Sequence, residues 1–228
     1  HLHETTGEVL AAVEENGERP LDTLNAIGLL GPRTQCVHMT DLGEQDMALL
    51  AATGAHVVHC PQSNMKLASG ACPTAKLLNK GVNVALGTDG AASNNDLNMF
   101  GEMQAAALLG KLTAADAAAL PAEDSLYMAT MGGARAMGLA DRIGSLETGK
   151  QADLISVDLS GPECQPLYNP LSQLVYVCNG SQVRNSWVAG SILVRDRELT
   201  RINTTDLLSR CAQWQQKIHT NQAQDHAL

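Results

Sequence analysis

Apolar runs of strand length alternate with segments of helical spacing over the first 140 residues of the chain. Each run is short, contains β-branched residues and is bounded by turn residues, as strands are. Strands that alternate with helices predict βα units, in which the strands lie parallel in one sheet. The expected strands cover residues 34–38, 55–60 and 82–87.

Four helices are expected between and after these strands. The first, at 41–53, would take Asp41 as its N-cap, because a carboxylate can accept hydrogen bonds from the free N–H groups of the first helical turn. A loop rich in Ser, Gly and Pro leads to the second. The remaining helices are predicted at 74–79, 99–111 and 122–137.

After residue 140 the apolar pattern changes to a period of two, the period of strands with one exposed face. The dipeptides Asn179-Gly180 and Ala189-Gly190 suit tight turns between antiparallel strands. We therefore expect a small β-domain at 141–203. Its predicted strands include residues 152–158, 174–177 and 186–194.

The last part of the chain has the spacing of a helix from residue 204 to 219, with Thr204 or Thr205 as the cap and Asp206 in the first turn. The residues beyond it are expected to fray. The predicted organisation is thus an α/β part at 1–140, the β-domain, and a C-terminal helix and tail at 204–228.

The composition narrows the class of partner. Of the 228 residues, 44% are hydrophobic and 17% are charged, which is enough apolar content for a large core. The formal net charge is −9 without a cluster of Lys or Arg, which argues against a nucleic-acid groove or an anionic membrane surface. A small molecule is the expected ligand.

The six cysteines form no CxxC pair, so neither a zinc knuckle nor a disulfide framework is predicted. No apolar run approaches the roughly 20 residues of a membrane span, and no leader pattern begins the chain. We expect reduced thiols in a cytoplasmic protein. The chain opens without Met on His1-Leu2-His3-Glu4, which resembles the end of a strand, so we also expect a segment upstream of it.

Each of the three predicted strands ends on a side chain capable of chemistry: His38, His59 and Asp89. In a parallel α/β barrel the carboxyl ends of the strands carry the active site, so these side chains are expected to converge. Each alone has a plainer interpretation. A strand-end histidine often binds backbone groups, and the aspartate of Gly87-Thr88-Asp89-Gly90 is also a common turn residue.

The first residues add a histidine and a carboxylate to this set. An imidazole at His1 can bind a metal, and a carboxylate at Glu4 can move protons beside it. His3 would point the other way in a regular strand and is expected to be structural.

Several strings together resemble the amidohydrolase superfamily, in its branch of nucleoside and triazine deaminases and chlorohydrolases, and most of all its 5'-methylthioadenosine/S-adenosylhomocysteine deaminases. The resemblance covers nearly the whole chain and implies the C-terminal half of a metal-dependent (β/α)8 TIM barrel with a small β-sandwich domain. The strings are His1 to Thr5, Cys36-Val37-His38, His59 to Gly70, Gly87 to Asn95, Ala129 to Gly138 and Ile143 to Leu154.

The resemblance also implies roles for individual residues. His1 matches the metal-binding histidine of the fifth barrel strand, and Glu4 matches a proton-shuttling carboxylate that contacts the purine. His38 matches the histidine of the sixth strand beside the reacting centre, and Asp89 matches the metal ligand of the eighth strand that also acts as base. Substrate contacts are expected at Ser93 and His59.

The implied activity is hydrolytic deamination of 5'-methylthioadenosine, S-adenosylhomocysteine or both, to the inosine analogue and ammonia. The implied cofactor is a divalent ion, with Zn²⁺ as the first expectation and Fe²⁺ or Mn²⁺ as alternatives. Asp89 would take a proton from the attacking water, and Glu4 would protonate the purine ring.

One departure from the family pattern is large. Both the His-x-His pair of the first barrel strand and the first four barrel strands themselves are absent from this chain. The implied partner is therefore an N-terminal half of the same protein, and a homo-oligomer is a further expectation. Two alternatives stay open. One is a guanine or triazine deaminase or a chlorohydrolase of the same superfamily, and the other is a non-catalytic subunit with the amidohydrolase fold.

Overall fold

The computed structural model describes the backbone of residues 1–225 and the side chains of residues 1–220. Of the tail expected after residue 219, residues 226–228 lie outside the described residues. The chain divides into two compact units, which are described separately. The first comprises His1–Gln151 and Asp158–Gln182, and the second comprises Ala152–Val157 and the chain from Val183 onward.

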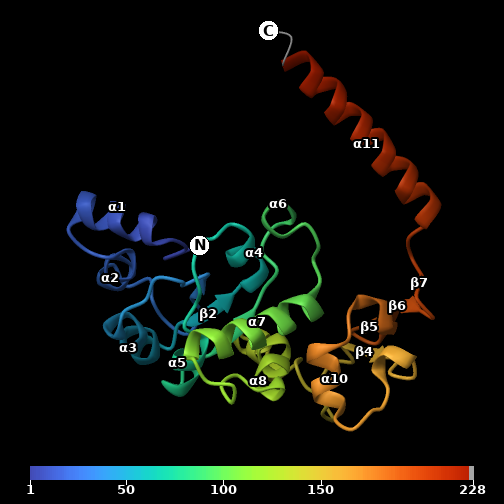
Figure 1. Ribbon diagram of the computed structural model, residues 1–228, viewed down its shortest axis with the longest axis horizontal. Helices are drawn as coiled ribbons and strands as arrows, with labels where there is room; N and C mark the ends of the chain where they lie inside the picture. Colours follow the sequence, from blue (N-terminus) through green and yellow to red (C-terminus); the bar gives the residue numbers. More distant parts are fainter. Residues whose placement is uncertain (226–228) are drawn as a thin grey trace. The chain divides into compact units, whose positions relative to one another are not determined.

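A parallel sheet organises the first unit (Figure 1). Its strands β1 (Gln35–Val37), β2 (His56–His59) and β3 (Val84–Leu86) pair in the order β1-β2-β3, which confirms the predicted βα pattern. The N-terminal segment lies beside β1 through a parallel bridge between Leu2 and His38. Among the described residues the parallel sheet is open rather than closed into a barrel.

Helices cover this sheet, and apolar side chains from both layers form the core. β3 is buried along its whole length, as expected for a strand covered on both faces. The four predicted helices are present, the last of them as α8, a π-helical segment and α9. The helical segments are α1 (Thr6–Asn16), α2 (Pro20–Ala26), α3 (Glu44–Thr53), α4 (Pro61–Lys66), α5 (Thr74–Asn79), α6 (Ala91–Asn94), α7 (Met99–Ala114), α8 (Ala122–Tyr127), η1 (Met128–Gly132), α9 (Gly133–Ala136), η2 (Pro162–Cys164), α10 (Pro170–Tyr176) and η3 (Gly180–Gln182).

The expected N-cap of α3 is wrong. The cap is Gly43 rather than Asp41, and the Asp46 carboxylate accepts a hydrogen bond from the Gly43 N–H at 2.7 Å. Asp41 instead accepts a hydrogen bond from the Arg19 guanidinium at 2.7 Å. A charged partner from a distant segment therefore outweighs the local capping preference.

The strand predicted at 174–177 is also wrong, because Pro170–Tyr176 forms α10. Asn169 accepts hydrogen bonds from the Leu171 and Ser172 N–H groups, and Pro170 takes the first helical position. These start signals favour a helix over the apparent alternation. Asn179-Gly180 is consequently no hairpin turn, and its glycine begins η3.

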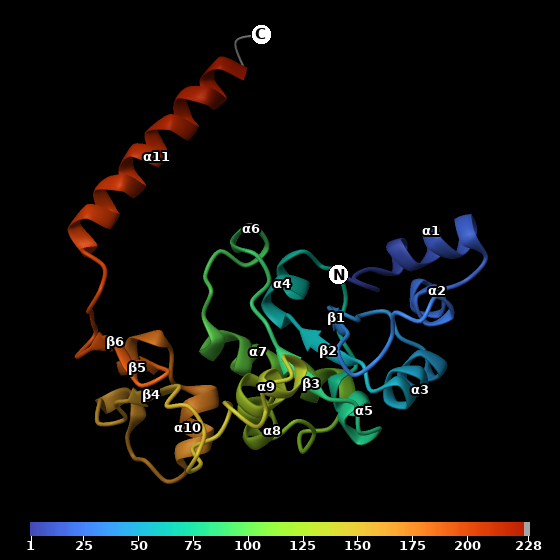
Figure 2. The same cartoon turned by 180° about the vertical axis from the view of Figure 1, so that it is seen from behind.

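The second unit contains an antiparallel sheet of four strands in the order β4-β5-β6-β7 (Figure 2). A hairpin joins β5 to β6 through Ala189 and Gly190, whose φ angles of 48° and 76° are those of a type I′ turn, as predicted. This is the one sheet that the described residues of the second unit form, so the two-sheet sandwich stays a prediction. The strands are β4 (Leu154–Val157), β5 (Val183–Val188), β6 (Ser191–Arg195) and β7 (Glu198–Leu199).

The terminal helix α11 (Thr204–Asp225) is confirmed, but it continues through residues 220–225, which were expected to fray, and its cap differs from the prediction. The Asn203 side chain accepts hydrogen bonds from the N–H groups of Thr205 and Asp206, so the cap lies one residue before Thr204. Over the part of the chain that the structure describes, no helix combines the length and the apolar character needed to cross a membrane.

Candidate metal centre

His1, His38 and Asp89 come together at the carboxyl ends of the parallel strands, as the sequence predicts. Each offers a ligand atom, and these atoms lie within 4.8 Å of one another. The His38 Nε2 atom is 3.1 Å from His1 Nδ1, and His1 Nε2 is 3.6 Å from Asp89 Oδ1. The two rings meet edge to face with their centroids 4.5 Å apart.

The strands end abruptly at these residues. His38 (φ 78°), Met39 (φ 51°) and Asp89 (φ 60°) all adopt the left-handed backbone conformation that favours glycine. Backbone hydrogen bonds hold the first two, from the His38 N–H to Val58 and from the Met39 N–H to Leu2. Such strain costs on the order of 1–3 kcal/mol per residue and is typical of sites where the backbone must aim a side chain.

The His38 ring is fully buried and is held by Asn64. Its Nδ1 atom is 2.8 Å from the Asn64 side-chain oxygen, so with this amide orientation Nδ1 carries the hydrogen and donates it. The lone pair of Nε2 then faces His1. A hydrogen bond to the distal nitrogen that fixes the tautomer in this way is typical of metal-site histidines.

Two serines hold Asp89. Its Oδ2 atom accepts hydrogen bonds from Ser63 Oγ at 2.8 Å and Ser93 Oγ at 2.6 Å, which leaves Oδ1 toward His1. Burial by itself would raise the pKa of Asp89, but the hydrogen bonds from Ser93 and Ser63 outweigh it and lower that pKa below its usual value. The carboxylate is therefore ionised and can serve as an anionic ligand or as a base.

Glu4 lies at the edge of the cluster. Its Oε2 atom is 3.7 Å from His1 Nδ1 and 3.6 Å from His38 Nε2, and the side chain is 26% exposed. The Ser69 hydroxyl donates to Oε1 at 3.3 Å, while the Thr40 hydroxyl donates to the Glu4 carbonyl at 2.7 Å. A partly exposed carboxylate in this position can exchange protons with a ligand.

The two residues expected to contact the substrate, Ser93 and His59, lie in different surroundings. Ser93 lies on α6 with its hydroxyl bonded to Asp89, directly beside the cluster. His59 ends β2 and is buried, and burial together with neighbouring His38 lowers its pKa to about 3, so its ring is neutral. Its Nδ1 has no hydrogen-bond partner among the described residues. Substrate contact by either residue stays a prediction.

His3 is structural, as expected. The Leu21 N–H donates to its Nε2 at 3.1 Å, so Nδ1 carries the hydrogen and donates to the Asp41 carbonyl at 2.8 Å. The Arg19 guanidinium bonds the same carbonyl at 2.8 Å. This network fixes the segment that carries His1 and Glu4.

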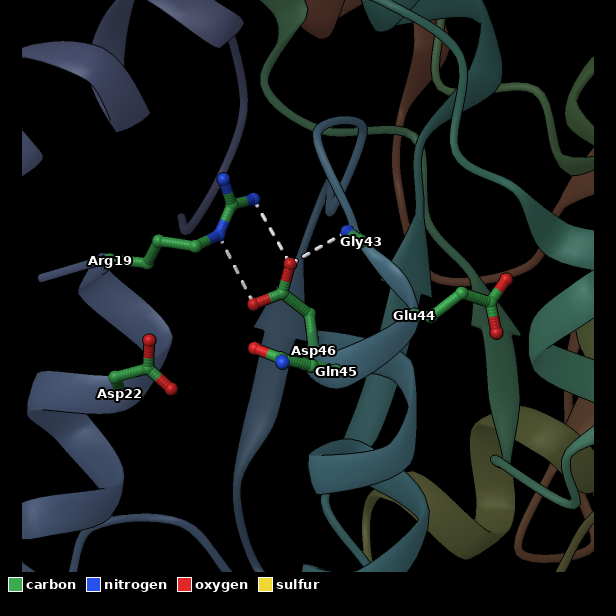
Figure 3. Close-up of a pocket in the computed structure, with 6 residues that line it drawn as sticks. All are labelled: Arg19, Asp22, Gly43, Glu44, Gln45 and Asp46. Atoms are coloured by element: carbon green, nitrogen blue, oxygen red, sulfur yellow. Dashed lines mark hydrogen bonds and ion pairs between the residues drawn. The ribbon is translucent and has the colours of Figure 1, made fainter.

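Arg19 also lines a pocket of about 230 Å³ in the first unit (Figure 3). Its guanidinium forms two contacts with the Asp46 carboxylate, and the same carboxylate caps α3 through Gly43. With Asp41 as a further partner, the charge of Arg19 is neutralised by the protein itself. The pocket is therefore a structural junction rather than a candidate anion site.

The donor set of the cluster fits a divalent metal ion. Two imidazole nitrogens and a carboxylate oxygen are ligands of borderline ions such as Zn²⁺, and catalytic zinc sites use three protein ligands. With Nδ1 bonded to Asn64, the His38 ring turns Nε2 toward the cluster, and Asp89 is ionised as a metal ligand must be. His38 thus joins the two predicted ligands, His1 and Asp89, within one potential coordination shell.

Sequence reasoning missed several residues that support the cluster. Ser63 and Ser69 lie within the string that follows His59, but no role was predicted for them. Glu102 lies outside every string quoted above, although a buried glutamate on the apolar face of α7 is itself a signal, because glutamate is seldom fully buried.

Comparisons with known proteins identify the family of the chain. The model of the amidohydrolase family matches residues 1–193. The chain is 57% identical over 218 residues to a 5-methylthioadenosine/S-adenosylhomocysteine deaminase from Teredinibacter turnerae, covering 96% of this chain and 49% of that protein. It is 50% identical to a protein of the same name from Saccharophagus degradans, covering 98% of this chain and 50% of that protein.

A crystal structure of an adenosine deaminase from Xanthomonas campestris with bound zinc is similar as well. Its TM-score is 0.95 at 51% identity, covering 96% of this chain and 50% of that chain. The chain therefore spans about half the length of the relatives it matches.

Proposed function

The chain belongs to the amidohydrolase family, and from this premise we propose that it is part of a deaminase of 5'-methylthioadenosine, S-adenosylhomocysteine or both. The products would be the inosine analogue and ammonia. The observation that carries the proposal is the convergence of His1, His38, Asp89 and Glu4 at one sheet edge. The names of the two relatives supply the substrate class.

The proposed whole protein contains a closed (β/α)8 barrel. Residues 1–140 would supply its C-terminal half, and an upstream half of the same protein would complete it. The open parallel sheet supports this, because an exposed edge of unpaired backbone groups needs a covering strand. The twofold greater length of the relatives supports it independently. The four-stranded sheet would form part of the small sandwich domain.

The proposed cofactor is a divalent ion, with Zn²⁺ favoured by the zinc-bound relative. His1 and Asp89 would bind it, and His38 lies beside these two residues. When bound, such an ion lowers the pKa of a water ligand and so makes that water a better nucleophile near neutral pH.

The chain's own residues account for the proton movements. Asp89 is ionised and keeps Oδ1 free of the serines, so it can accept a proton from the attacking water. Glu4 is partly exposed at the edge of the cluster, where it can protonate a purine ring nitrogen. His38 presents its Nε2 lone pair and can orient the attacking water by accepting its hydrogen bond. Ser93 and His59 are proposed to border the substrate.

Water would add to C6 of the purine and the amino group would leave as ammonia, so that one oxygen replaces one nitrogen. The cytoplasm is the proposed compartment, since the cysteines are free thiols.

Substitution of Asp89 tests the proposal in the full-length protein. We expect Asp89→Asn to lower kcat for methylthioadenosine at least 100-fold, because a proton acceptor contributes about 10²–10⁴-fold. Ammonia release measures turnover. Asp96→Asn, at an exposed position between α6 and α7, is the matched control and should retain activity.

A substrate panel completes the test: methylthioadenosine, S-adenosylhomocysteine, adenosine, guanine and a chlorinated triazine. Turnover of the adenine nucleosides supports the proposal. Full activity of Asp89→Asn, or turnover of guanine or the triazine alone, contradicts it.

A further inference from the structure

Glu102 on α7 is a fully buried carboxylate outside the predicted site. Its two oxygens bind two different segments. Oε2 accepts a hydrogen bond from the Gln62 backbone N–H at 3.2 Å, and Oε1 accepts one from Asn94 Nδ2 at 2.6 Å. Of the helices that carry this network, α4 contacts both α6 and α7, and it lies between them in both views (Figures 1 and 2).

Both segments frame Asp89. Asn94 Nδ2 also donates to the carbonyl of Thr88 at 2.7 Å, so Glu102 is linked through one side chain to the peptide just before Asp89. Gln62 precedes Ser63, whose hydroxyl donates to Asp89 Oδ2. A single carboxylate thus connects the backbone ahead of Asp89 and the serine that holds its side chain.

Stability alone gives little reason for this arrangement. Among the described residues no basic side chain offsets the charge of Glu102, and its charged neighbours are Asp96 and Asp89. Burial raises the pKa of Glu102, while the two N–H donors oppose that shift. Burying an acidic group without a cation costs free energy that an apolar residue in the same place would not.

We propose that Glu102 is a positioning residue that holds the Asp89 loop and Ser63 in register, so that Asp89 keeps its left-handed backbone and its orientation toward His1. The consequence for catalysis rests on the proposed function. The consequence for metal binding and loop order does not.

The first test is Glu102→Gln in the full-length protein. The substitution keeps the shape of the side chain but replaces one of its two acceptor oxygens with an NH₂ group. That group faces either the Gln62 N–H or the Asn94 Nδ2, so one of these two donors loses its acceptor. We expect the Kd for Zn²⁺, titrated into chelator-stripped protein, to rise about 10–100-fold, as for other supporting residues of metal sites. Hydrogen exchange of residues 87–95 should accelerate, and kcat should fall about 10-fold or more with KM nearly unchanged.

Met103→Ala is the matched control. Met103 follows Glu102 on α7 and is buried, but its side chain contributes none of these hydrogen bonds, so its loss destabilises the helix packing without releasing the loop. We expect a lower Tm with unchanged Zn²⁺ affinity. Asn94→Ala is the second variant: it leaves Glu102 in place, breaks the link to Thr88, and should reproduce the metal and exchange effects.

Asn94→Asp combined with Glu102→Gln separates the two links. Asn94→Asp alone places two carboxylates in contact and should weaken Zn²⁺ binding further than Asn94→Ala does. In the double variant the amide introduced at position 102 can donate to the new carboxylate while accepting from Gln62, but that carboxylate has no hydrogen to donate to the Thr88 carbonyl. Recovery of Zn²⁺ affinity to the level of Asn94→Ala, and not to that of the wild type, supports the proposal.

Two results would overturn it. One is that Zn²⁺ affinity and exchange rates are unchanged in both Glu102→Gln and Asn94→Ala. The other is that Met103→Ala, compared with a Glu102→Gln protein of the same Tm, loses Zn²⁺ affinity by the same factor. Neither measurement uses a substrate. If no adenine nucleoside is turned over but these variants respond as expected, the proposed function fails while the role of Glu102 stands.

Discussion

The side chains of the cluster are oriented by hydrogen bonds with neighbouring residues that are not themselves candidate ligands. Asn64 determines which nitrogen of His38 keeps a lone pair, and two serines determine which oxygen of Asp89 faces His1. At this scale the chemistry resides in protonation states and tautomers. Both follow from neighbours that contact the functional groups directly.

Asn64→Ala tests the assignment of the His38 tautomer. The substitution removes the acceptor of the Nδ1 hydrogen, so the proton can move to Nε2 and occupy the face turned toward His1. We expect kcat of the full-length protein to fall about 10–100-fold with a smaller change in KM. The ¹⁵N shifts of the His38 ring should change from those of the Nδ1–H form.

Asn79→Ala is the control, because Asn79 is exposed at the end of α5. Wild-type kcat in Asn64→Ala, with an unchanged His38 spectrum, would refute the assignment.

The elements begin and end where specific capping residues and close approaches require it. Asn169 starts α10 and thereby removes a predicted strand. Gly132 lets η1 approach β3 closely, since a Cβ there would lie 2.5 Å from the Val84 carbonyl oxygen. Local hydrogen bonds and backbone contacts therefore decide element type at positions where the apolar pattern is ambiguous.

Asn169→Ala should destabilise the chain by about 1 kcal/mol through loss of the α10 cap. The Leu171 and Ser172 N–H groups lose their shared acceptor. The midpoint of urea unfolding measures the effect in the full-length protein. Asn25→Ala, at an exposed position near the end of α2, should leave the midpoint unchanged. Equal midpoints for both variants would argue against the cap.

At the scale of the whole first unit, ionic contacts tie the N-terminal segment to the sheet. Arg19 connects the start of α2 with Asp41 after β1 and Asp46 in α3, and His3 joins the same network. The residues involved are far apart in the sequence. Their contacts hold the strand-like segment of His1 beside β1.

This network predicts a dependence of stability on pH. The hydrogen bond from Arg19 lowers the pKa of Asp41 below its ordinary value of 3.8. The stabilisation is therefore complete above about pH 4 and is lost as the pH falls through the lower folded-state pKa. We expect the Tm difference between wild type and Asp41→Asn to be largest near neutral pH and to shrink below about pH 4.

Asp22→Asn serves as the comparison, because Asp22 lines the same pocket on an exposed part of α2. It should change Tm little at either pH. A Tm difference for Asp41→Asn that stays constant across this range would show that the Arg19 contact does not stabilise the unit.

Much of the fold and of the candidate site could be predicted from the chain alone. Short apolar runs located β1, β2 and β3, and the residue at the end of each strand pointed to His38, His59 and Asp89. Of these, His59 is the one whose buried, neutral ring does not join the metal cluster. Pattern identifies the strand end but not the surroundings of the side chain that follows it.

The sequence by itself determined the βα periodicity, the hairpin at Ala189-Gly190 and the residue types of the metal cluster, because these depend on local spacing and on the chemistry of single side chains. Only the tertiary structure decided that Asp41 binds Arg19 instead of capping α3. The same holds for the contact of Asn64 with the His38 ring and for the hydrogen bond of Glu102 with Asn94 beside the Asp89 loop. The physical reason is that these contacts join distant segments. Their energies depend on burial and distance, which exist only after the chain has folded.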